Sequence, residues 1–142
     1  MSGTHRYSVS VAAAVVREDG KLLAIKRRDN GHWEPPGGVL EPGETATAGV
    51  VREVKEETGL VVEPVRLSGV YQNIARDILA LVFLARQVSG KPRKSDESVR
   101  VDWLTADQVR ARMTEAYAVR LLDAVQGHDV IPVRAHDGRD LL

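Results

Sequence analysis

The chain has 142 residues, of which 43% are hydrophobic, a length and composition that suit one globular domain. Its 20 basic and 20 acidic residues cancel to a formal net charge of zero, which gives no electrostatic footprint for nucleic acid or for an anionic membrane surface. There is no cysteine, no signal-peptide core and no run approaching the roughly 20 apolar residues of a membrane span, so we expect a soluble, cytoplasmic protein without disulfides or thiolate metal sites.

Two strands are predicted near the N-terminus. Residues 1–6 are polar, and we expect them to be flexible. Residues 7–16 are rich in Val and Ala with little charge, which predicts a buried strand, and residues 21–26 alternate well enough for a second one. Because Asp19 and Gly20 between them form a hairpin turn signal, we expect these two strands to pair.

A loop and a helix follow. Residues 27–32 are polar and lead to Trp33, for which packing is favoured over ligand contact. The Pro-Pro-Gly-Gly run behind Trp33 forbids regular structure, whereas residues 45–58 contain no proline and predict a helix. Gly37 and Gly38 suit a loop that brings its backbone close to a metal or a phosphate.

The predicted helix carries an acidic face near its C-terminus. Glu53, Glu56 and Glu57 share this face through their i, i+3 and i+4 spacing, and Gly59 behind them suits a helix end. The three carboxylates repel one another and oppose the helix dipole, so the placement is unfavourable without a cation. Mg²⁺ and Mn²⁺ prefer such oxygen ligands. A solvated acidic face is the alternative that the helix alone leaves open.

The second half of the chain predicts three more strands and two helices. In order, these are a strand over residues 61–72 interrupted near Pro64, a strand over 77–88, a basic turn-forming loop over 89–96, a strand over 99–104, a helix that Thr105 and Gln108 begin as a capping box, and a helix over 115–126 that Gly127 ends. Val119, Leu122 and Val125 predict the buried stripe of the last helix, which we expect to carry no chemistry. We expect residues 128–142 to form a poorly ordered tail.

Strands first, a helix in the middle and helices at the end predict a single-domain α/β protein. Counted from Gly38, the spacing is glycine, five residues, Glu44, seven residues and then REVKEETGL, residues 52–60. This pattern resembles the Nudix box of the Nudix hydrolase family at every specified position. The resemblance implies the single-domain Nudix fold, an α/β/α sandwich with a mixed β-sheet, over about residues 7–127.

The same resemblance implies roles for the residues of the box. Glu53, Glu56 and Glu57 are implied as metal ligands, with Glu56 also counted among the catalytic residues. Arg52 is implied to orient the box carboxylates by ion pairing. Glu44 opens the helix, where its charge complements the helix dipole, so capping could account for it, and it is also a candidate to assist the site.

A general base is expected from outside the box. Nudix enzymes often supply an acid from the region that precedes the strand predicted over residues 99–104, as the base or as an extra metal ligand. Glu97 is our candidate. Asp96 is the competing choice, and a site without any outside acid is the third option.

Substrate contacts are also expected outside the helix. Lys26, Arg27 and Arg28 end the second strand near the expected mouth of the site, where one of them could hold a substrate phosphate. Arg27 is our choice, and an exposed basic turn is the alternative. Tyr71 and its neighbour Gln72 could contact a base or a sugar, and Gly37 and Gly38 could approach the diphosphate through their backbone.

The implied activity is divalent-metal-dependent hydrolysis of the diphosphate linkage in a nucleoside diphosphate linked to another group. Mg²⁺ is the expected metal and Mn²⁺ a substitute, and a nucleoside triphosphate, including an oxidised one, is the default substrate. A non-catalytic Nudix module that senses a nucleotide is the alternative. Isomerisation of a diphosphate ester is a third possibility, but this chain lacks the cysteine that such isomerases commonly use. A homodimer is compatible with the family, whereas neither a membrane nor a nucleic acid is an expected partner.

Overall fold

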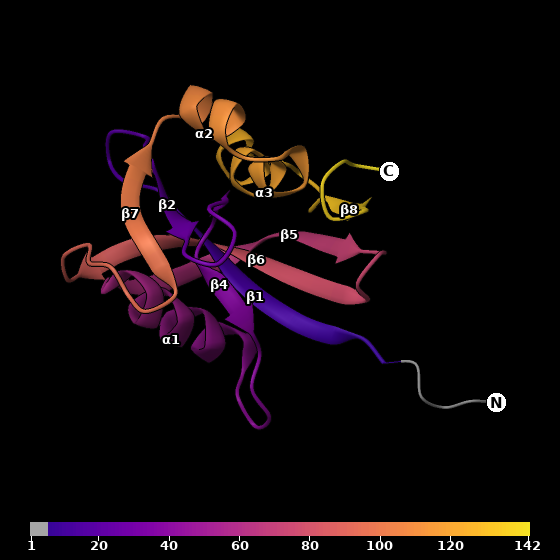
Figure 1. The fold of residues 1–142 in the computed structure, drawn as a ribbon, viewed down its shortest axis with the longest axis horizontal. Helices are drawn as coiled ribbons and strands as arrows, with labels where there is room; N and C mark the ends of the chain where they lie inside the picture. The colour runs from indigo at the N-terminus through magenta and orange to yellow at the C-terminus, as the bar shows by residue number, and fades with distance from the viewer. Residues whose placement is uncertain (1–5) are drawn as a thin grey trace.

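The computed structural model describes residues 6–142, so the flexible segment predicted over residues 1–6 lies outside the described part except for Arg6. Its helices and strands, in chain order, are β1 (Ser8–Val15), β2 (Leu22–Arg27), β3 (Trp33–Glu34), β4 (Gly37–Val39), α1 (Ala46–Thr58), β5 (Val61–Asn73), β6 (Ile78–Ser89), β7 (Ser98–Leu104), α2 (Ala106–Arg112), α3 (Glu115–Gln126) and β8 (Val133–His136). Figure 1 shows how they are arranged in space.

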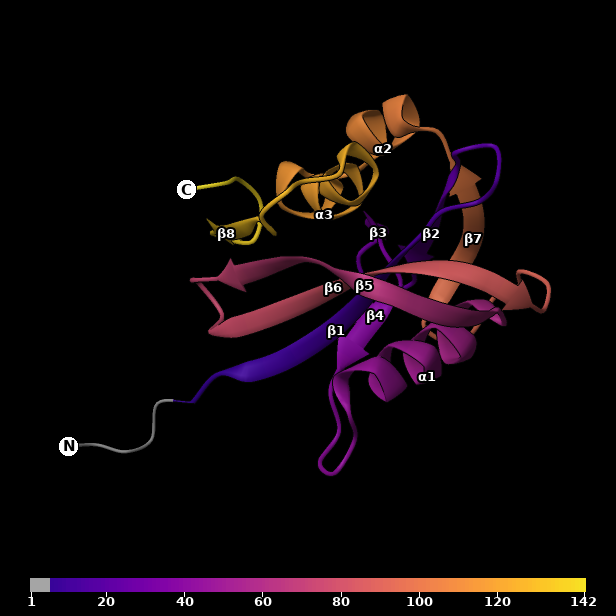
Figure 2. The ribbon, with the colours of Figure 1, turned by 180° about the vertical axis from the view of Figure 1, so that it is seen from behind.

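The strands form two sheets. The larger has the order β4-β1-β6-β5-β8 and is mixed, because β1 runs parallel to β6 and β5 parallel to β8 while the other pairs are antiparallel. The smaller, β3-β2-β7, is antiparallel. Figure 2 shows the large sheet between α1 on one face and α2 with α3 on the other. The predicted α/β/α sandwich with a mixed sheet is therefore confirmed.

Strand β1 supplies apolar side chains to both layers. Val11, Ala13 and Val15 pack in the core beneath α1, whereas Ala12 and Ala14 pack in the core beneath α3. This alternation follows from the two-residue period of a strand. Val50 and Val54 of α1 are fully buried in the first core, and each contributes about 1.5–3 kcal/mol by leaving water. The acidic helix is thereby anchored to the centre of the sheet.

The predicted hairpin between β1 and β2 does not form. The turn at Gly20 is present, with a φ of 85° and a 2.8 Å hydrogen bond to the carbonyl of Arg17. However, Val16 and Leu22 make only an isolated bridge, after which β2 joins the other sheet. The physical reason is that β4 and β6 already occupy the two edges of β1, which leaves no hydrogen-bonding edge for β2.

The caps of the helices agree with the sequence. Thr45 begins α1 by accepting a hydrogen bond from the N–H of Ala48 at 3.2 Å, and Gly59 ends it with a φ of 79°. The capping box of Thr105 and Gln108 is formed at α2. These local signals confirm the start of both helices and the end of α1.

The C-terminal segment differs from its prediction. Residues 133–136, expected in a poorly ordered tail, form strand β8 and pair with β5 from Val70 to Asn73. The strand alternates apolar and polar residues, a pattern that the prediction did not use. Its last residue, His136, is fully buried. This tail therefore closes one edge of the large sheet.

Helix α3 buries two of the three residues predicted for its inward stripe. Val119 and Leu122 are partly buried against the core, whereas Val125 is 42% exposed. Leu121 and three alanines complete the buried face, and the small alanine side chains let the helix approach the sheet closely. Arg120 lies within this buried face. Among residues 6–142, no helix combines the length and the apolar composition needed to cross a membrane.

Candidate active site

The acidic face of α1 lies against the short strand β4. The backbone N–H of Gly37 donates a 2.7 Å hydrogen bond to Oε1 of Glu57. A Cβ on Gly38 would lie 2.5 Å from the carboxyl carbon of Glu53, so that carboxyl group occupies space that any larger residue would fill. Gly37 meets a different limit, because its Cβ would lie 2.5 Å from the carbonyl oxygen of Val11 in β1. Both glycines are thus required by close approach.

Arg52 lies at the centre of the box carboxylates. Its Nε and Nη2 donate to Glu44 at 2.6 and 2.9 Å, and its Nη1 donates to Glu53 at 2.8 Å and to Glu56 at 3.3 Å. Glu44 does not cap the helix, because Thr45 occupies the N-cap position. Glu44 instead receives both the guanidinium of Arg52 and the N–H of Glu41. The two hydrogen bonds lower the pKa of Glu44 to about 2.

Two of the acids, Glu53 and Glu57, are buried, and burial disfavours their charged forms. Burial raises the pKa of Glu57 to about 8, against the hydrogen bond from Gly37, and the charges of Glu53 and Glu97 raise it further. Burial also raises the pKa of Glu53, although Arg52 opposes this. Glu56 differs, since 59% of its side chain is exposed. A cation among these groups would relieve the cost of charging Glu53 and Glu57.

The donor set fits a hard divalent cation, although its side chains do not form a closed cage. Within residues 6–142, no three Asp, Glu, His or Cys side chains are grouped so that they could hold a metal ion. Glu53 and Glu56 are turned toward Arg52, and Glu57 toward Gly37. Carboxylate oxygens are the ligands that Mg²⁺ and Mn²⁺ favour, and the exposed side chain of Glu56 has room to turn. Glu53, Glu56 and Glu57 are accordingly the residues that could hold such an ion.

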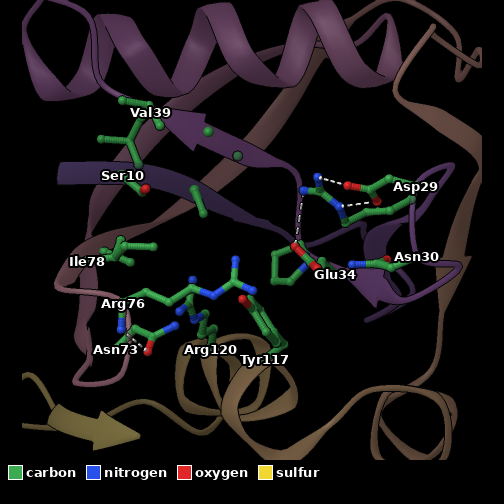
Figure 3. Close-up of a pocket in the computed structure, with 17 residues that line it drawn as sticks. Ser10, Asp29, Asn30, Glu34, Val39, Asn73, Arg76, Ile78, Tyr117 and Arg120 are labelled. Carbon is green, nitrogen blue, oxygen red and sulfur yellow. Dashed lines mark hydrogen bonds and ion pairs between the residues drawn. The ribbon is translucent and has the colours of Figure 1, made fainter. Parts of the chain in front are cut away.

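A pocket of about 290 Å³ opens beside this face. Gly37 and Gly38 form part of its lining, and so do Ser10 and Val39, which Figure 3 shows close together. Arg27 stands in another wall, where it donates to Asp29 at 2.9 and 2.7 Å and lies 3.8 Å from Glu34. The predicted substrate contact Arg27 is therefore at the pocket, although its guanidinium already faces two acids.

Glu97 lies within electrostatic reach of the acidic face. The charge of Glu97 raises the pKa of both Glu53 and Glu57. Backbone carbonyls of Asp96 and Glu97 bind Arg28, which holds this loop against the end of β2. The loop thus brings Glu97 toward the box from outside it.

Tyr71 does not line the pocket, contrary to the predicted substrate contact. It is fully buried, and its hydroxyl donates a 2.7 Å hydrogen bond to Asp123 of α3. Asp123 also accepts two hydrogen bonds from Arg134 of β8, at 2.8 and 2.7 Å. Tyr71 therefore joins β5, α3 and β8 within the core. Because Tyr71 is fully buried, it has no exposed surface for a ligand.

The sequence interpretation missed the wall of the pocket that β5, the turn after it and α3 form. Asn73 and Arg76 come from the end of β5 and the turn after it, and Tyr117 and Arg120 come from α3, the helix expected to carry no chemistry. Figure 3 shows them together on the side of the pocket opposite α1. One signal was available for Arg120, because it lies between the small and apolar residues that form the buried face of α3. A charged side chain at such a position is rare unless it has a partner.

Comparison with known proteins agrees with this arrangement. The sequence matches the family model for the NUDIX domain over residues 6–124. It is 58% identical over 136 residues to a MutT-like protein of Streptomyces ambofaciens, covering 96% of this chain and 88% of that protein. It is 36% identical over 96 residues to an ADP-ribose pyrophosphatase of Methanocaldococcus jannaschii, covering 63% of this chain and 57% of that one. The crystal structure of a MutT NUDIX hydrolase from Burkholderia pseudomallei superposes with a TM-score of 0.75 at 31% identity, over 84% of this chain and 98% of that chain.

Proposed function

Because this chain belongs to the Nudix family, we propose that it hydrolyses the diphosphate linkage of a nucleoside diphosphate linked to another group, in a reaction that requires a divalent metal ion. A nucleoside triphosphate, including an oxidised one, is the default substrate. The observation that carries this proposal is the pair of buried acids, Glu53 and Glu57, held against Gly37 and Gly38 at the lining of a pocket. Buried carboxyl groups at a pocket are typical of sites that bind cations or transfer protons.

In this proposal, Glu53, Glu56 and Glu57 hold Mg²⁺, with Mn²⁺ as a substitute. When bound, the ion neutralises the phosphates of the substrate and lowers the pKa of a water molecule. Arg52 orients the ligands, because one guanidinium binds both Glu53 and Glu56 and is itself anchored by Glu44. Because Glu44 holds the guanidinium of Arg52, Arg52 stays paired with Glu53 and Glu56 and does not bind the substrate phosphate instead.

The remaining roles belong to residues around the pocket. Glu97 accepts the proton of the attacking water as a general base, for which its electrostatic contact with Glu53 and Glu57 is the support. Arg27 binds a phosphate oxygen through the guanidinium it presents to the pocket wall. The backbone of Gly37 and Gly38 lines the pocket beside Glu53 and Glu57, so a diphosphate bound along it lies close to these acids.

The test is a panel of nucleotides, incubated with Mg²⁺ and analysed for phosphorylated products. Nucleoside triphosphates, their oxidised forms and ADP-ribose belong in the panel, the last because one relative bears that name. Hydrolysis of at least one compound into two phosphorylated products is expected. It should be lost in Glu56→Gln, an exposed position where the substitution keeps the shape and leaves the fold intact. Turnover without added metal in the presence of EDTA would contradict the proposal.

A nucleotide-sensing module without catalysis is the competing function. It predicts tight binding of one compound in the panel with no product from any of them. A sensor has no need of the full set of box acids, so their joint presence favours the enzyme. We place the activity in the cytoplasm and keep a homodimer as part of the proposal, which sedimentation of the purified protein would test.

A further inference from the structure

Arg120 is a buried cation on the side of the pocket opposite the acids. Arg120 is 8% exposed and lines the pocket. The rings of Tyr117 and Tyr71 lie 4.6 and 5.5 Å from its guanidinium carbon. Burial lowers the pKa of Arg120, which records the cost of its charge in this position. Because a guanidinium stays protonated in proteins, that cost persists unless acceptors offset it.

The hydrogen-bonding capacity of Arg120 is almost unused. A guanidinium has five N–H donors and no acceptor. Among residues 6–142, Arg120 Nε is the single fully buried side-chain polar atom without a partner, and Nη2 alone has a close polar neighbour, Nε2 of His136 at 3.1 Å. The two aromatic rings stabilise the charge but accept no conventional hydrogen bond. A buried donor without an acceptor destabilises the folded protein.

His136 does not meet this need, because of its tautomer. The backbone N–H of Gly138 donates to Nδ1 of His136 at 2.9 Å, so Nδ1 carries no proton. Burial, reinforced by the charge of Arg120, lowers the pKa of His136 and favours the neutral ring. A neutral imidazole without a proton on Nδ1 carries it on Nε2. The nitrogen that faces Arg120 is then also a donor, and two donors meet.

The groups around Arg120 add donors and few acceptors. Arg76 presents an exposed guanidinium to the same side of the pocket and makes no side-chain hydrogen bond or ion pair with any described residue. Asn73 uses its Oδ1 to accept from the N–H of Arg76 at 3.2 Å, which leaves its amide nitrogen as a donor. Glu34 attracts Arg120 electrostatically, but among residues 6–142 it makes no ion pair with Arg120 within 4.0 Å. No described carboxylate therefore pairs directly with Arg120, and an oxygen of a ligand could do so.

We propose that Arg120 is a specificity-determining residue that donates hydrogen bonds to an oxygen without hydrogen, keto or anionic, on the group linked to the diphosphate of the substrate. The inference rests on the proposed function, since it assumes that the diphosphate end lies at Gly37 and Gly38. The substrate then spans the pocket, with its metal-binding end at α1 and its acceptor oxygen at α3. An amino group at the same place would add a further donor and be rejected.

Binding measurements with two pairs of probes test the proposal without relying on turnover. The α,β-methylene triphosphates of inosine and adenosine differ at one position of the base, a keto oxygen against an amino group. NADP⁺ and NAD⁺, titrated in EDTA, differ by one phosphate monoester. In calorimetric titration, the wild-type protein should prefer the first member of at least one pair by about 10- to 100-fold, the range for a hydrogen bond to a charged donor. The pair that discriminates identifies the oxygen as keto or anionic.

Arg120→Met should bring that preference close to one. It should also keep or raise the melting temperature of the ligand-free protein, because it removes a buried cation with unpaired donors and retains similar volume. Arg112→Met is the matched control, since Arg112 also lies over an aromatic ring, Trp33, but outside the pocket. Arg120→Lys keeps the charge without the planar fork and should weaken the preference even if the Met variant does not fold.

Either of two results would overturn the proposal. The first is a wild-type protein that shows no preference in either pair, including one that binds no probe. The second is a preference that survives in a folded Arg120 variant, which would leave Arg120 a structural residue. The proposed function fails on a separate observation, the absence of hydrolysis across the nucleotide panel, so the two failures are distinguishable.

Discussion

Arg52 and Glu44 are joined by two hydrogen bonds, at 2.6 and 2.9 Å, although seven residues lie between them in the sequence. The pair connects the loop before α1 to the middle of the helix, and the same guanidinium extends to Glu53 and Glu56. A planar guanidinium that binds one carboxylate with two parallel hydrogen bonds is fixed in orientation. Glu44 therefore determines which donors of Arg52 remain for the other acids.

This pair should make stability depend on pH in a defined window. The pKa of Glu44 is lowered from 4.5 to about 2, first by the hydrogen bond from Arg52 and then by the N–H of Glu41. A lowered pKa contributes stability that is fully present above the unfolded value and is lost as the pH falls toward the folded one. The melting temperature of Glu44→Gln should lie below wild type at pH 7, and the difference should shrink between about pH 4.5 and pH 2.

Glu63→Gln is the control for this experiment. It removes a 2.8 Å ion pair with Arg86 in which more than half of each side chain is exposed, and such pairs contribute little. Its melting temperature should stay near wild type throughout the same range. A Glu44→Gln difference that is constant with pH would show that packing, and not the charge of Glu44, accounts for the loss.

The general base can be assigned by comparing two neighbouring acids. Glu97→Gln should lower kcat by about 10²- to 10⁴-fold, the usual contribution of a positioned base, and leave KM nearly unchanged. Asp96→Asn, one residue earlier, should leave both kcat and KM as in wild type. The opposite outcome would assign the base to Asp96, and two active variants would leave the site without an outside acid.

Substituting Gly37 should lower stability, whereas substituting Gly38 should lower activity. A Cβ at Gly37 would lie 2.5 and 2.8 Å from backbone atoms of β1, which cannot move aside, so Gly37→Ala should lose about 1–3 kcal/mol of stability. A Cβ at Gly38 meets only the carboxyl end of Glu53, a side chain that can turn away. Gly38→Ala should therefore keep its melting temperature and lose about 100-fold in kcat, because it displaces a proposed metal ligand. Similar melting temperatures for both variants would contradict this reading of the two contacts.

The sequence could predict features that depend on neighbouring residues, and it failed where distant segments meet. The end of α1 at Gly59 and its acidic face are set by spacing along one helix, and the structure has them as expected, although Thr45 and not Glu44 is the N-cap. The contact of β1 with β6 joins segments about 70 residues apart, so no local pattern could choose it over the hairpin. Arg120 reaches the pocket only because α3 packs across the sheet, a relationship that no spacing within α3 contains.

The error at Tyr71 has a more specific cause. Alternation along a strand predicts which residues share a face, provided that the strand is regular. Strand β5 has register shifts between Pro64 and Arg66 and again between Leu67 and Gly69. Each shift breaks the two-residue period, so counting from the start of the strand cannot say where Tyr71 points. The structure turns it toward α3 and Asp123.

Tyr71→Phe is the direct test of this corrected position. The substitution keeps the buried ring and deletes the hydroxyl that donates to Asp123 at 2.7 Å. Because hydrogen bonds to charged groups contribute about 1.5–3 kcal/mol when buried, the free energy of unfolding should fall by about that amount. The value should lie toward the lower end, since Arg134 still satisfies Asp123 with two hydrogen bonds. Chemical denaturation of the purified variant measures it.

The kinetic constants of the same variant separate a core residue from a substrate contact. KM should match wild type for any nucleotide that the protein hydrolyses, because Tyr71 lies outside the pocket lining. Tyr117→Phe is the matched control, since its hydroxyl makes no hydrogen bond with any described residue and its ring lines the pocket; its free energy of unfolding should not change. A tenfold rise in KM for Tyr71→Phe at unchanged stability would return Tyr71 to the substrate site, because only lost ligand contact could raise KM without weakening the fold.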